Sequence, residues 1–205
     1  MITLSRKDWH SGLPLLIIKK WGDVEGDNGY AIDTEKFYEN VMNRYKYGGL
    51  DTPGLYLDET TMRICYSHRR LFAQLAKELV KQGDNARAQK VLAYAEQAIP
   101  AYNVPQVYES GSYEIATAYA SIGETGKAIT LLNVLIAESK DYIDWAFSLG
   151  DSRIAMVQRD CLYKFWQWNQ CNELLKDMDK ERYKQSNQQF EEKYMRLAQL
   201  MNYQN

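Results

Sequence analysis

The chain has 205 residues, of which 45% are hydrophobic and 25% are charged, so it can bury a full core in one domain or in a short repeat array. Its 25 Lys and Arg residues are balanced by 27 Asp and Glu residues. The resulting net charge of -2 argues against a nucleic-acid partner, which would require a clustered excess of basic residues. The three cysteines, Cys65, Cys161 and Cys171, form no C-x-x-C pair. We therefore expect no disulfide framework, no metal site and no cofactor, and we predict that the thiols are buried as small apolar groups.

The N-terminal region carries one apolar run, LPLLII at residues 13–18. Six residues cannot span a bilayer, which takes about 20, and no small-x-small cleavage site follows. The run predicts a strand or a segment packed on helices, and we expect neither a membrane span nor an export signal. The acidic spacing in DVEGDNG, residues 23–29, is that of a calcium loop. However, Asn28 and Thr34 stand where that loop needs glycine and glutamate, which favours a solvated turn.

A short helix is predicted after Asp33, which can serve as its N-cap. Its apolar stripe recurs every four residues, at Phe37, Val41 and Tyr45. The glycine pair at residues 48–49 is expected to end it. We predict that residues 1–57 form an irregular N-terminal arm with this one helix, and that residues 58–205 form a helical-repeat domain.

Two antiparallel helices joined by a tight turn are predicted at the start of that domain. Asp58 can cap the first helix, and Gly83 can end it in a left-handed conformation. Asp84 or Asn85 can cap the second helix, and Pro100 ends it. Small residues along both helices allow a close approach.

The stretch from Arg69 to about Tyr102 resembles a tetratricopeptide repeat, a helical hairpin of about 34 residues. Measured from Gly83, the signature positions hold Phe72, Leu75, Ala76, Leu79, Ala88, Leu92, Ala95 and Pro100. A second unit follows around Gly123, with Ile115, Ala116, Tyr119, Ala128, Leu132 and Leu135 at the matching offsets. It departs from the pattern in having Ser112 at the first aromatic position, Leu135 at the second alanine and Lys140 at the proline.

A third helix pair is expected over residues 151–179, although it does not align with the first two. A last helix over residues 181–201 carries apolar residues at helical spacing and is expected to cap the array with a polar outer face. The predicted fold is therefore all-α: antiparallel helical hairpins stacked as a right-handed, tetratricopeptide-like solenoid.

Residues 33–105 also resemble the soluble C-terminal region of large multi-spanning bacterial membrane proteins classed as protein O-mannosyltransferase-like. The resemblance rests on TEKFYENVMNRYKYGGLDTPGLYLDETTMRI and the following LFAQLAKELV. It implies a membrane-tethered, periplasm-facing tail, or a stand-alone paralogue of one, whose membrane half is encoded on the same or an adjacent gene. Because glycosyl transfer would belong to that membrane half, no catalytic residue is carried over.

Other motifs do not support catalysis. GETGKA at residues 123–128 hints at a phosphate loop, but Ser121 and Ala128 stand where that motif needs glycine and a hydroxyl residue. The only histidines are His10 and His68, and neither has spacing that suggests a triad or metal site. We expect His68, beside Arg69 and Arg70, to lie on a solvated helix face.

Aromatic residues are concentrated in YKFWQWNQC, residues 163–171. Trp166 and Trp168 are two residues apart, so on a helix their directions differ by about 200° and one of them is expected to be exposed. Packing between helices explains most of these rings. The alternative is a carbohydrate-binding or carbohydrate-active module that uses Trp166 together with Trp145. Paired acidic residues in a cleft beside either tryptophan would favour that alternative.

The favoured function is a non-catalytic interaction scaffold that binds a protein or peptide along the first helix of each pair. The positions predicted on that side are Arg70, Ala73, Lys77 and Val80 in the first unit, and Ser110, Tyr113, Thr117 and Ala120 in the second. Among them, Arg70 and Lys77 can clamp a carboxylate, whereas Tyr113 can pack on an apolar anchor with Thr117 beside it.

Overall fold

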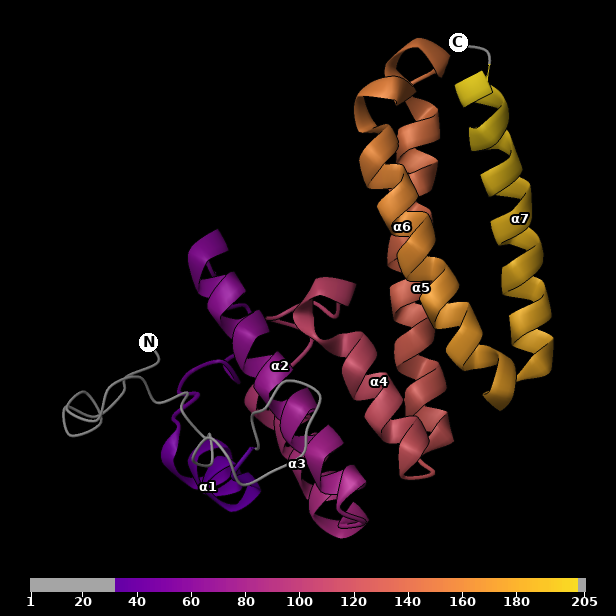
Figure 1. Ribbon diagram of the computed structural model, residues 1–205. Helices are drawn as coiled ribbons and strands as arrows, with labels where there is room; N and C mark the ends of the chain where they lie inside the picture. Colours follow the sequence, from indigo (N-terminus) through magenta and orange to yellow (C-terminus); the bar gives the residue numbers. More distant parts are fainter. Residues whose placement is uncertain (1–31, 203–205) are drawn as a thin grey trace, which may run out of the picture. The chain divides into compact units, whose positions relative to one another are not determined.

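All regular secondary structure that the computed structural model describes, over residues 32–202, is helical (Figure 1). This confirms the all-α prediction for those residues. The predictions for the apolar run at 13–18, the acidic turn at 23–29 and His10 lie outside the described residues. The elements are α1 (Thr34–Glu39), the π-helical turn η2 (Asn40–Arg44), α2 (Glu59–Lys81), α3 (Asn85–Ala98), the 3-10 turn η3 (Tyr108–Ser110), α4 (Ser112–Ser121), α5 (Thr125–Ser148), α6 (Asp151–Met178) and α7 (Lys180–Asn202).

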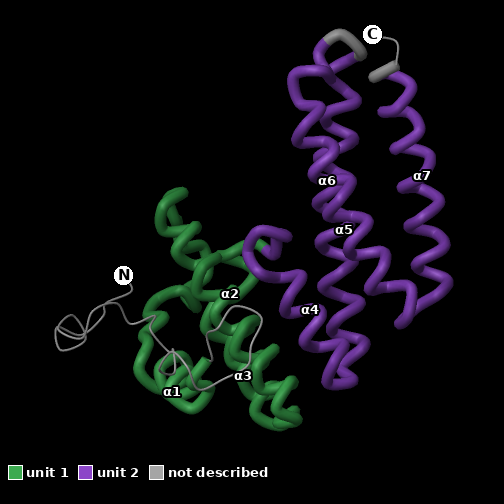
Figure 2. Tube along the Cα trace, viewed as in Figure 1, with its two compact units in different colours: residues 1–105 green, residues 106–205 purple. Residues whose placement is uncertain are grey.

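The chain divides into two compact units, residues 1–105 and residues 106–205 (Figure 2). Each unit is described by itself below. The predicted boundary between an arm and a repeat domain at residue 58 is a different division and stays a prediction, as does the stacking of hairpins into a right-handed solenoid.

Three aspartates cap the helices of the first unit as predicted. The carboxylates of Asp33, Asp58 and Asp84 accept hydrogen bonds from backbone N–H groups in the first turns of α1, α2 and α3, at 3.1, 2.9 and 3.0 Å. These bonds satisfy donors that the helix itself leaves without a partner. The sequence signals for the starts of these helices were therefore sufficient.

The helical segment after Asp33 ends earlier than predicted, at Arg44 rather than at the glycine pair. Tyr45 has extended backbone geometry, with ψ at 144°, and this directs the chain inward. Tyr47 is consequently buried against Phe72, with ring centroids 5.3 Å apart, and its hydroxyl donates to the Val41 carbonyl at 3.2 Å. The helical segment thus ends because the Tyr47 ring is buried, and not because of the glycine pair.

The α2–α3 hairpin places every predicted helical signature residue in the core: Phe72, Leu75, Ala76, Leu79, Ala88, Leu92 and Ala95 are buried. Gly83, with φ at 78°, allows the turn between the helices. The N–H of Gly83 donates to Val80 and that of Asp84 to Leu79, each at 2.9 Å. This pairing satisfies the last carbonyls of α2.

Substituting Ala88 tests the predicted close approach of α2 and α3. Ala88→Leu adds volume to a fully buried site on α3, so we expect a loss of about 1–3 kcal/mol in the free energy of unfolding, measured by urea denaturation. Ala86→Leu is the matched control because Ala86 is exposed on the same helix. Equal midpoints for the two variants would contradict the packing role of Ala88.

Arg69 corrects the prediction of a solvated helix face around His68. The Arg69 side chain is only 2% exposed, and it donates to the carbonyls of Val104 at 2.6 Å, Pro105 at 2.7 Å and Ile99 at 3.3 Å. His68 is partly buried, and burial lowers the pKa of its imidazole. The polypeptide that follows α3 thus folds back over α2 and takes its hydrogen-bond donors from an arginine.

Asn103 ties the same loop to the segment before α2. Its side-chain amide donates to the carbonyls of Leu50 at 2.7 Å and Thr52 at 2.6 Å, and the Tyr102 hydroxyl donates to Asp51 at 2.8 Å. These bonds join parts of the sequence about 50 residues apart. They hold residues 50–52 and the loop after α3 as one structure.

The second unit begins with a hairpin that turns in the same way as the first. Gly123 has φ at 84°, its N–H donates to Ala120, and the N–H of Glu124 donates to Tyr119. The predicted core positions of this hairpin, Ile115, Ala116, Tyr119, Ala128, Leu132 and Leu135, are buried. Lys140 stands where a repeat would have proline, so α5 continues to Ser148. Gly150, with φ at 83°, then lies in the turn between α5 and α6.

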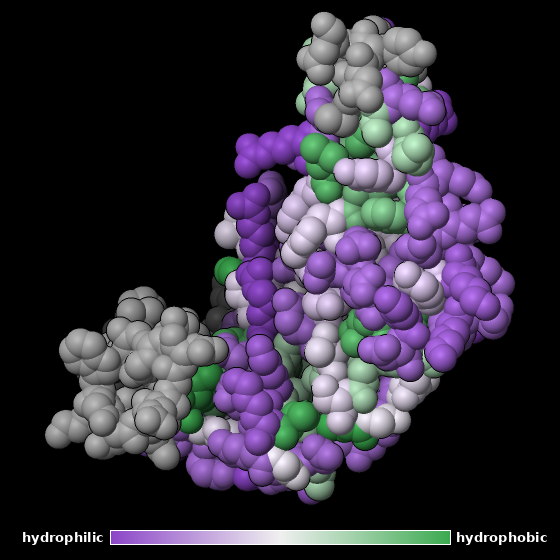
Figure 3. Space-filling model, turned by 45° about the vertical axis from the view of Figure 1, so that its right-hand side comes forward, coloured by the Kyte–Doolittle hydropathy of each residue, from purple (hydrophilic) through white to green (hydrophobic). Residues whose placement is uncertain are grey.

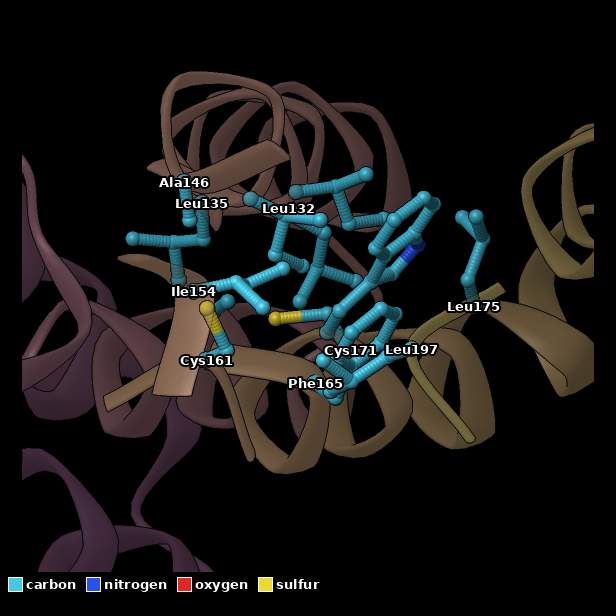
Figure 4. Close-up of a cluster of buried hydrophobic side chains, with 13 residues drawn as sticks. Leu132, Leu135, Ala146, Ile154, Cys161, Phe165, Cys171, Leu175 and Leu197 are labelled. Atoms are coloured by element: carbon cyan, nitrogen blue, oxygen red, sulfur yellow. The ribbon is translucent and has the colours of Figure 1, made fainter. Parts of the chain in front are cut away.

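The predicted third helix pair is wrong, because residues 151–178 form the single helix α6. No proline or glycine interrupts this stretch. The following helix, α7, agrees with the predicted last helix. Figure 4 shows the core that α5, α6 and α7 enclose. The core residues of α6 recur at helical spacing, at Ile154, Cys161, Phe165, Trp168, Cys171 and Leu175.

The cysteines and tryptophans of the core agree with expectation. Cys65, Cys161 and Cys171 are all buried free thiols. Trp168 is fully buried, whereas Trp166 is 47% exposed, as their separation along the helix requires. On the face that Figure 3 draws, hydrophilic side chains predominate and hydrophobic areas are small.

Candidate functional site

The four predicted site residues lie in two pairs on two helices. Arg70 and Lys77 are exposed on α2 in the first unit, and Thr117 is exposed on α4 in the second, where Tyr113 is partly buried. Some of these groups are already engaged: Arg70 donates to the Ser67 hydroxyl at 3.2 Å, and the Thr117 hydroxyl donates to the Tyr113 carbonyl at 3.0 Å. Each pair is therefore a separate candidate.

Two residues that were expected beside these pairs do not belong to an open face. Ala73 is 2% exposed and Ser110 is fully buried. Ala73 packs within the core of the first unit because it lies between Phe72 and Leu75 in the buried stripe of α2. Ser110 exchanges hydrogen bonds with its own turn, donating to the Val107 carbonyl at 2.7 Å. The predicted binding face is thus narrower than the repeat pattern suggested.

Tyr113 belongs to a continuous row of rings on the second unit, which we call the aromatic strip: Tyr113, Tyr108, Trp166 and Tyr163. Tyr113 stacks on Tyr108 at 5.1 Å between centroids, Tyr108 meets Trp166 edge-on at 5.4 Å, and Trp166 stacks on Tyr163 at 5.6 Å. Trp166 is 47% exposed and Tyr163 is 46% exposed. The strip thus runs from a half-buried end on α4 to a well-exposed end on α6.

Local structure explains why the two tyrosines of the half-buried end meet. Residues 108–110 form a 3-10 turn, and Gly111, with φ at 86°, reverses the chain into α4. The Ser110 and Ser112 hydroxyls share a hydrogen bond of 2.8 Å that fixes this corner. Tyr108 and Tyr113 therefore lie on the same side of the corner, close enough to stack.

On α6 the exposed end of the strip follows from helical spacing. Tyr163 and Trp166 are three residues apart and share one face, while Phe165 and Trp168 stack at the opposite, buried face. The same run of aromatic residues thus supplies both the core and the surface. This is the arrangement that the sequence predicted for the two tryptophans.

Charged side chains border the strip, and acidic ones predominate. The Lys164 ammonium lies 2.8 Å from Glu138 and 3.5 Å from Glu109. Gln167 also donates to Glu109 at 2.6 Å. Burial acts to raise the pKa of the Glu109 carboxyl, but the Gln167 hydrogen bond and the Lys164 charge outweigh it and lower that pKa. One ammonium between two carboxylates leaves a net negative charge beside the rings.

At the half-buried end of the strip, the pKa values of the Tyr108 and Tyr113 hydroxyls are raised, so both stay protonated at neutral pH. Burial is the main cause that raises the pKa of Tyr108 and of Tyr113, and the negative charge of Glu114 contributes to both shifts. A neutral phenol can donate a hydrogen bond while its ring packs against an apolar group. The strip can therefore bind a ligand that combines apolar groups with hydrogen-bond acceptors.

One lysine contacts both carboxylates beside the strip. The carbohydrate-active alternative called for paired acidic residues in a cleft, whereas Glu109 and Glu138 are the acidic residues beside the strip and both contact Lys164. A general acid needs a raised pKa, and that of Glu109 is lowered. Within the described residues, no three His, Cys, Asp or Glu side chains are grouped so that they could hold a metal ion.

Sequence reasoning identified two of the four rings, Tyr113 as a peptide-contacting residue and Trp166 as part of the alternative. It missed Tyr108 and Tyr163. The spacing of Tyr163 and Trp166 was a usable signal, because residues three apart share a helix face. No sequence pattern indicated that the turn at residues 108–110 packs against α6.

Comparisons with known proteins do not extend this picture. No protein-family model, no curated protein and no solved structure matches the chain. Over residues 32–202, none of the helices combines the length and apolar character needed to cross a membrane.

Proposed function

We propose that the protein is a non-catalytic helical interaction module, and that the aromatic strip binds a protein segment carrying arginine or lysine next to an apolar side chain. The observation that carries the proposal is the exposure of Trp166, 47%, in a row of contacting rings. Tryptophan and tyrosine dominate the energetics of protein interfaces. A half-exposed tryptophan in such a row is therefore the strongest candidate for a binding anchor.

The charges around the strip favour a basic partner. Glu109 and Glu138 share one lysine, and the exposed Glu114 adds further negative charge near Tyr108 and Tyr113. An arginine can stack on a tyrosine or tryptophan ring while its guanidinium pairs with a carboxylate. The acidic ligand predicted for Arg70 and Lys77 would bind the exposed surface of α2 and not the aromatic strip.

Ring geometry favours a peptide over a sugar. A platform for sugars needs open ring faces, but Trp166 and Tyr163 stack on each other, with ring planes 14° apart, and Tyr108 approaches Trp166 edge-on. The parts of the ring faces that neighbouring rings leave uncovered are small and point in different directions. Such a surface suits side chains that insert at several angles.

The resemblance of residues 33–105 supports the second element of the proposal, the setting in which the module acts. We propose that the chain serves as the accessory soluble tail of a membrane glycosyltransferase-like protein and faces the periplasm. The membrane half, encoded on the same or an adjacent gene, is then the natural source of the bound segment. No glycosyl-transfer residue is assigned to this chain.

The test selects short random peptides from a display library with the full chain and measures the affinity of the best synthetic peptide. We expect selected peptides to combine Arg or Lys with aromatic or aliphatic residues. Trp166→Ala should weaken binding about tenfold or more, because it removes the central ring of the strip. Added salt should weaken binding further.

Trp145→Ala is the matched control. Trp145 is 48% exposed on α5 and contacts Tyr142, which lies outside the strip. Equal loss of affinity in both variants would contradict the assignment. Acidic selected peptides whose binding is lost in the Arg70→Ala, Lys77→Ala variant would move the site to α2. Binding of an oligosaccharide that depends on Trp166, without peptide binding, would favour the carbohydrate-binding alternative.

A further inference from the structure

Helices α5 and α7 contact each other in a regular register where both pack on α6. Lys140 donates to the Gln189 side chain, and Lys193 pairs with Asp144, with partners separated by 49 residues in each case. The Arg196 guanidinium lies over the Phe147 ring at 4.4 Å, which continues the same register. Because the residue numbers of the paired side chains increase together on both helices, α5 and α7 run parallel. These contacts close the seam between the two helices from Lys140 onward.

Before Lys140 the seam is open and forms a pocket of about 250 Å³. Its polar lining comes from one face of each helix, Asn133 and Lys140 on α5 and Arg182, Gln185, Ser186 and Gln189 on α7. Its apolar lining consists of Ile136 and Ala137 on α5 and Leu175 on α6. Among the described residues, the lining contains two cations and no carboxylate. We call this space the α5–α7 pocket.

Contacts within the pocket wall hold several of these groups in place. The Ser186 hydroxyl accepts a hydrogen bond from the Trp168 indole at 2.8 Å and donates to the Asn172 carbonyl oxygen at 2.6 Å. Lys140 lies over the Trp168 ring at 5.8 Å, besides its bond to Gln189. The wall thus has an ordered hydrogen-bond network behind it, as a binding site requires.

The charges indicate what the pocket can hold. Arg182 is paired with Asp179, whose carboxylate lies 3.0 Å from the Arg182 Nε. The Asp179 charge offsets one of the two cations, so the site carries a net charge of about one positive unit, which suits a monoanion better than a dianion. Arg and Lys together can bind a carboxylate through charge-assisted hydrogen bonds. Ile136 and Leu175 are almost fully buried and form the floor of the pocket, and the exposed Ala137 lies beside them, so a short hydrocarbon chain attached to that carboxylate has a small apolar contact area.

We propose that the α5–α7 pocket binds a small aliphatic monocarboxylate, with its carboxylate between Lys140 and Arg182 and its hydrocarbon part on Ile136 and Leu175. This site is independent of the aromatic strip. The volume limits the ligand to a small organic acid, because pockets for drug-sized molecules begin at about 300 Å³.

The test titrates the ¹⁵N-labelled full chain with hexanoate and follows amide chemical shifts. We expect saturable shifts confined to residues near 133–140 and 182–189. Hexanamide has the same chain without the charge and should bind about tenfold or more weakly. Inorganic phosphate should also bind more weakly than hexanoate, because it lacks the apolar part.

Two variants test whether the two cations of the pocket bind the hexanoate carboxylate. Lys140→Gln and Arg182→Gln should each weaken hexanoate binding about tenfold. Lys184→Gln, at an exposed position of α7 outside the pocket lining, should leave it unchanged. The proposal is overturned by the absence of saturable shifts up to about 10 mM hexanoate, by shifts elsewhere, or by equal binding of hexanamide. The wild-type titration gives this answer even if a variant fails to fold.

Discussion

Arg69→Met is expected to lower the free energy of unfolding of the first unit by about 3 kcal/mol. Arg69 is buried, and its guanidinium serves the carbonyls of Ile99, Val104 and Pro105. Methionine fills a similar volume but cannot donate, so these carbonyls lose their donor. Each unsatisfied buried acceptor costs about 1–3 kcal/mol.

The expected total is less than the sum of three such costs, since the substitution also removes a buried cation. Burial lowers the pKa of Arg69 to about 10, although Tyr66 and Cys65 oppose the shift, so the side chain is charged at neutral pH and its burial is unfavourable. Urea denaturation followed by circular dichroism measures the difference. Arg70→Met is the matched control on the adjacent, exposed position, with an expected change within about 0.5 kcal/mol. A larger effect at Arg70 than at Arg69 would refute the structural role assigned to the buried arginine.

Trp168→Ala is expected to cost the second unit about 3–5 kcal/mol. The indole is fully buried between Phe165 and Phe190, with ring centroids 6.3 and 5.6 Å away, and it donates to Ser186. Removing it leaves a large cavity among α5, α6 and α7 and takes away the donor of the Ser186 hydroxyl. Thermal unfolding followed by circular dichroism should show a markedly lower midpoint for the second unit.

Trp166→Ala provides the comparison two residues earlier on the same helix. That ring is 47% exposed, so the expected cost is about 1 kcal/mol or less. The two substitutions therefore separate stability from binding: Trp168→Ala should lower the midpoint of the second unit, and Trp166→Ala should weaken peptide binding. If Trp166→Ala lowered the midpoint as much as Trp168→Ala, the division of α6 into a buried and an exposed face would be incorrect.

Much of the helical structure was predictable because its signals are local. The caps at Asp33, Asp58 and Asp84, the turns at Gly83 and Gly123, and the buried faces around Phe72 and Leu132 each follow from residues within a few turns of one another. The third helix pair failed because it was inferred from the repeat pattern. The stretch from 151 to 178 contains no residue that breaks a helix.

The candidate sites were less predictable because they depend on contacts between distant parts of the chain. Arg69 looked solvent-exposed in sequence because the carbonyls that it satisfies follow it by 30 to 36 residues. The aromatic strip joins Tyr108 to Trp166, and the α5–α7 pocket joins Lys140 to Arg182. Helical periodicity assigns a residue to a face, but it does not identify the element that packs there.

The order of helix packing also has a consequence for the time course of folding. The main packing partners are neighbours along the chain: α2 with α3, α4 with α5, α5 with α6, and α6 with α7. Chains with such local contacts fold in about microseconds to milliseconds, since closing each hairpin loses little chain entropy. The α5–α7 seam is different, because its pairs can meet only after α6 has positioned both helices. We therefore expect the side-chain contacts of this seam to form last during folding of the second unit.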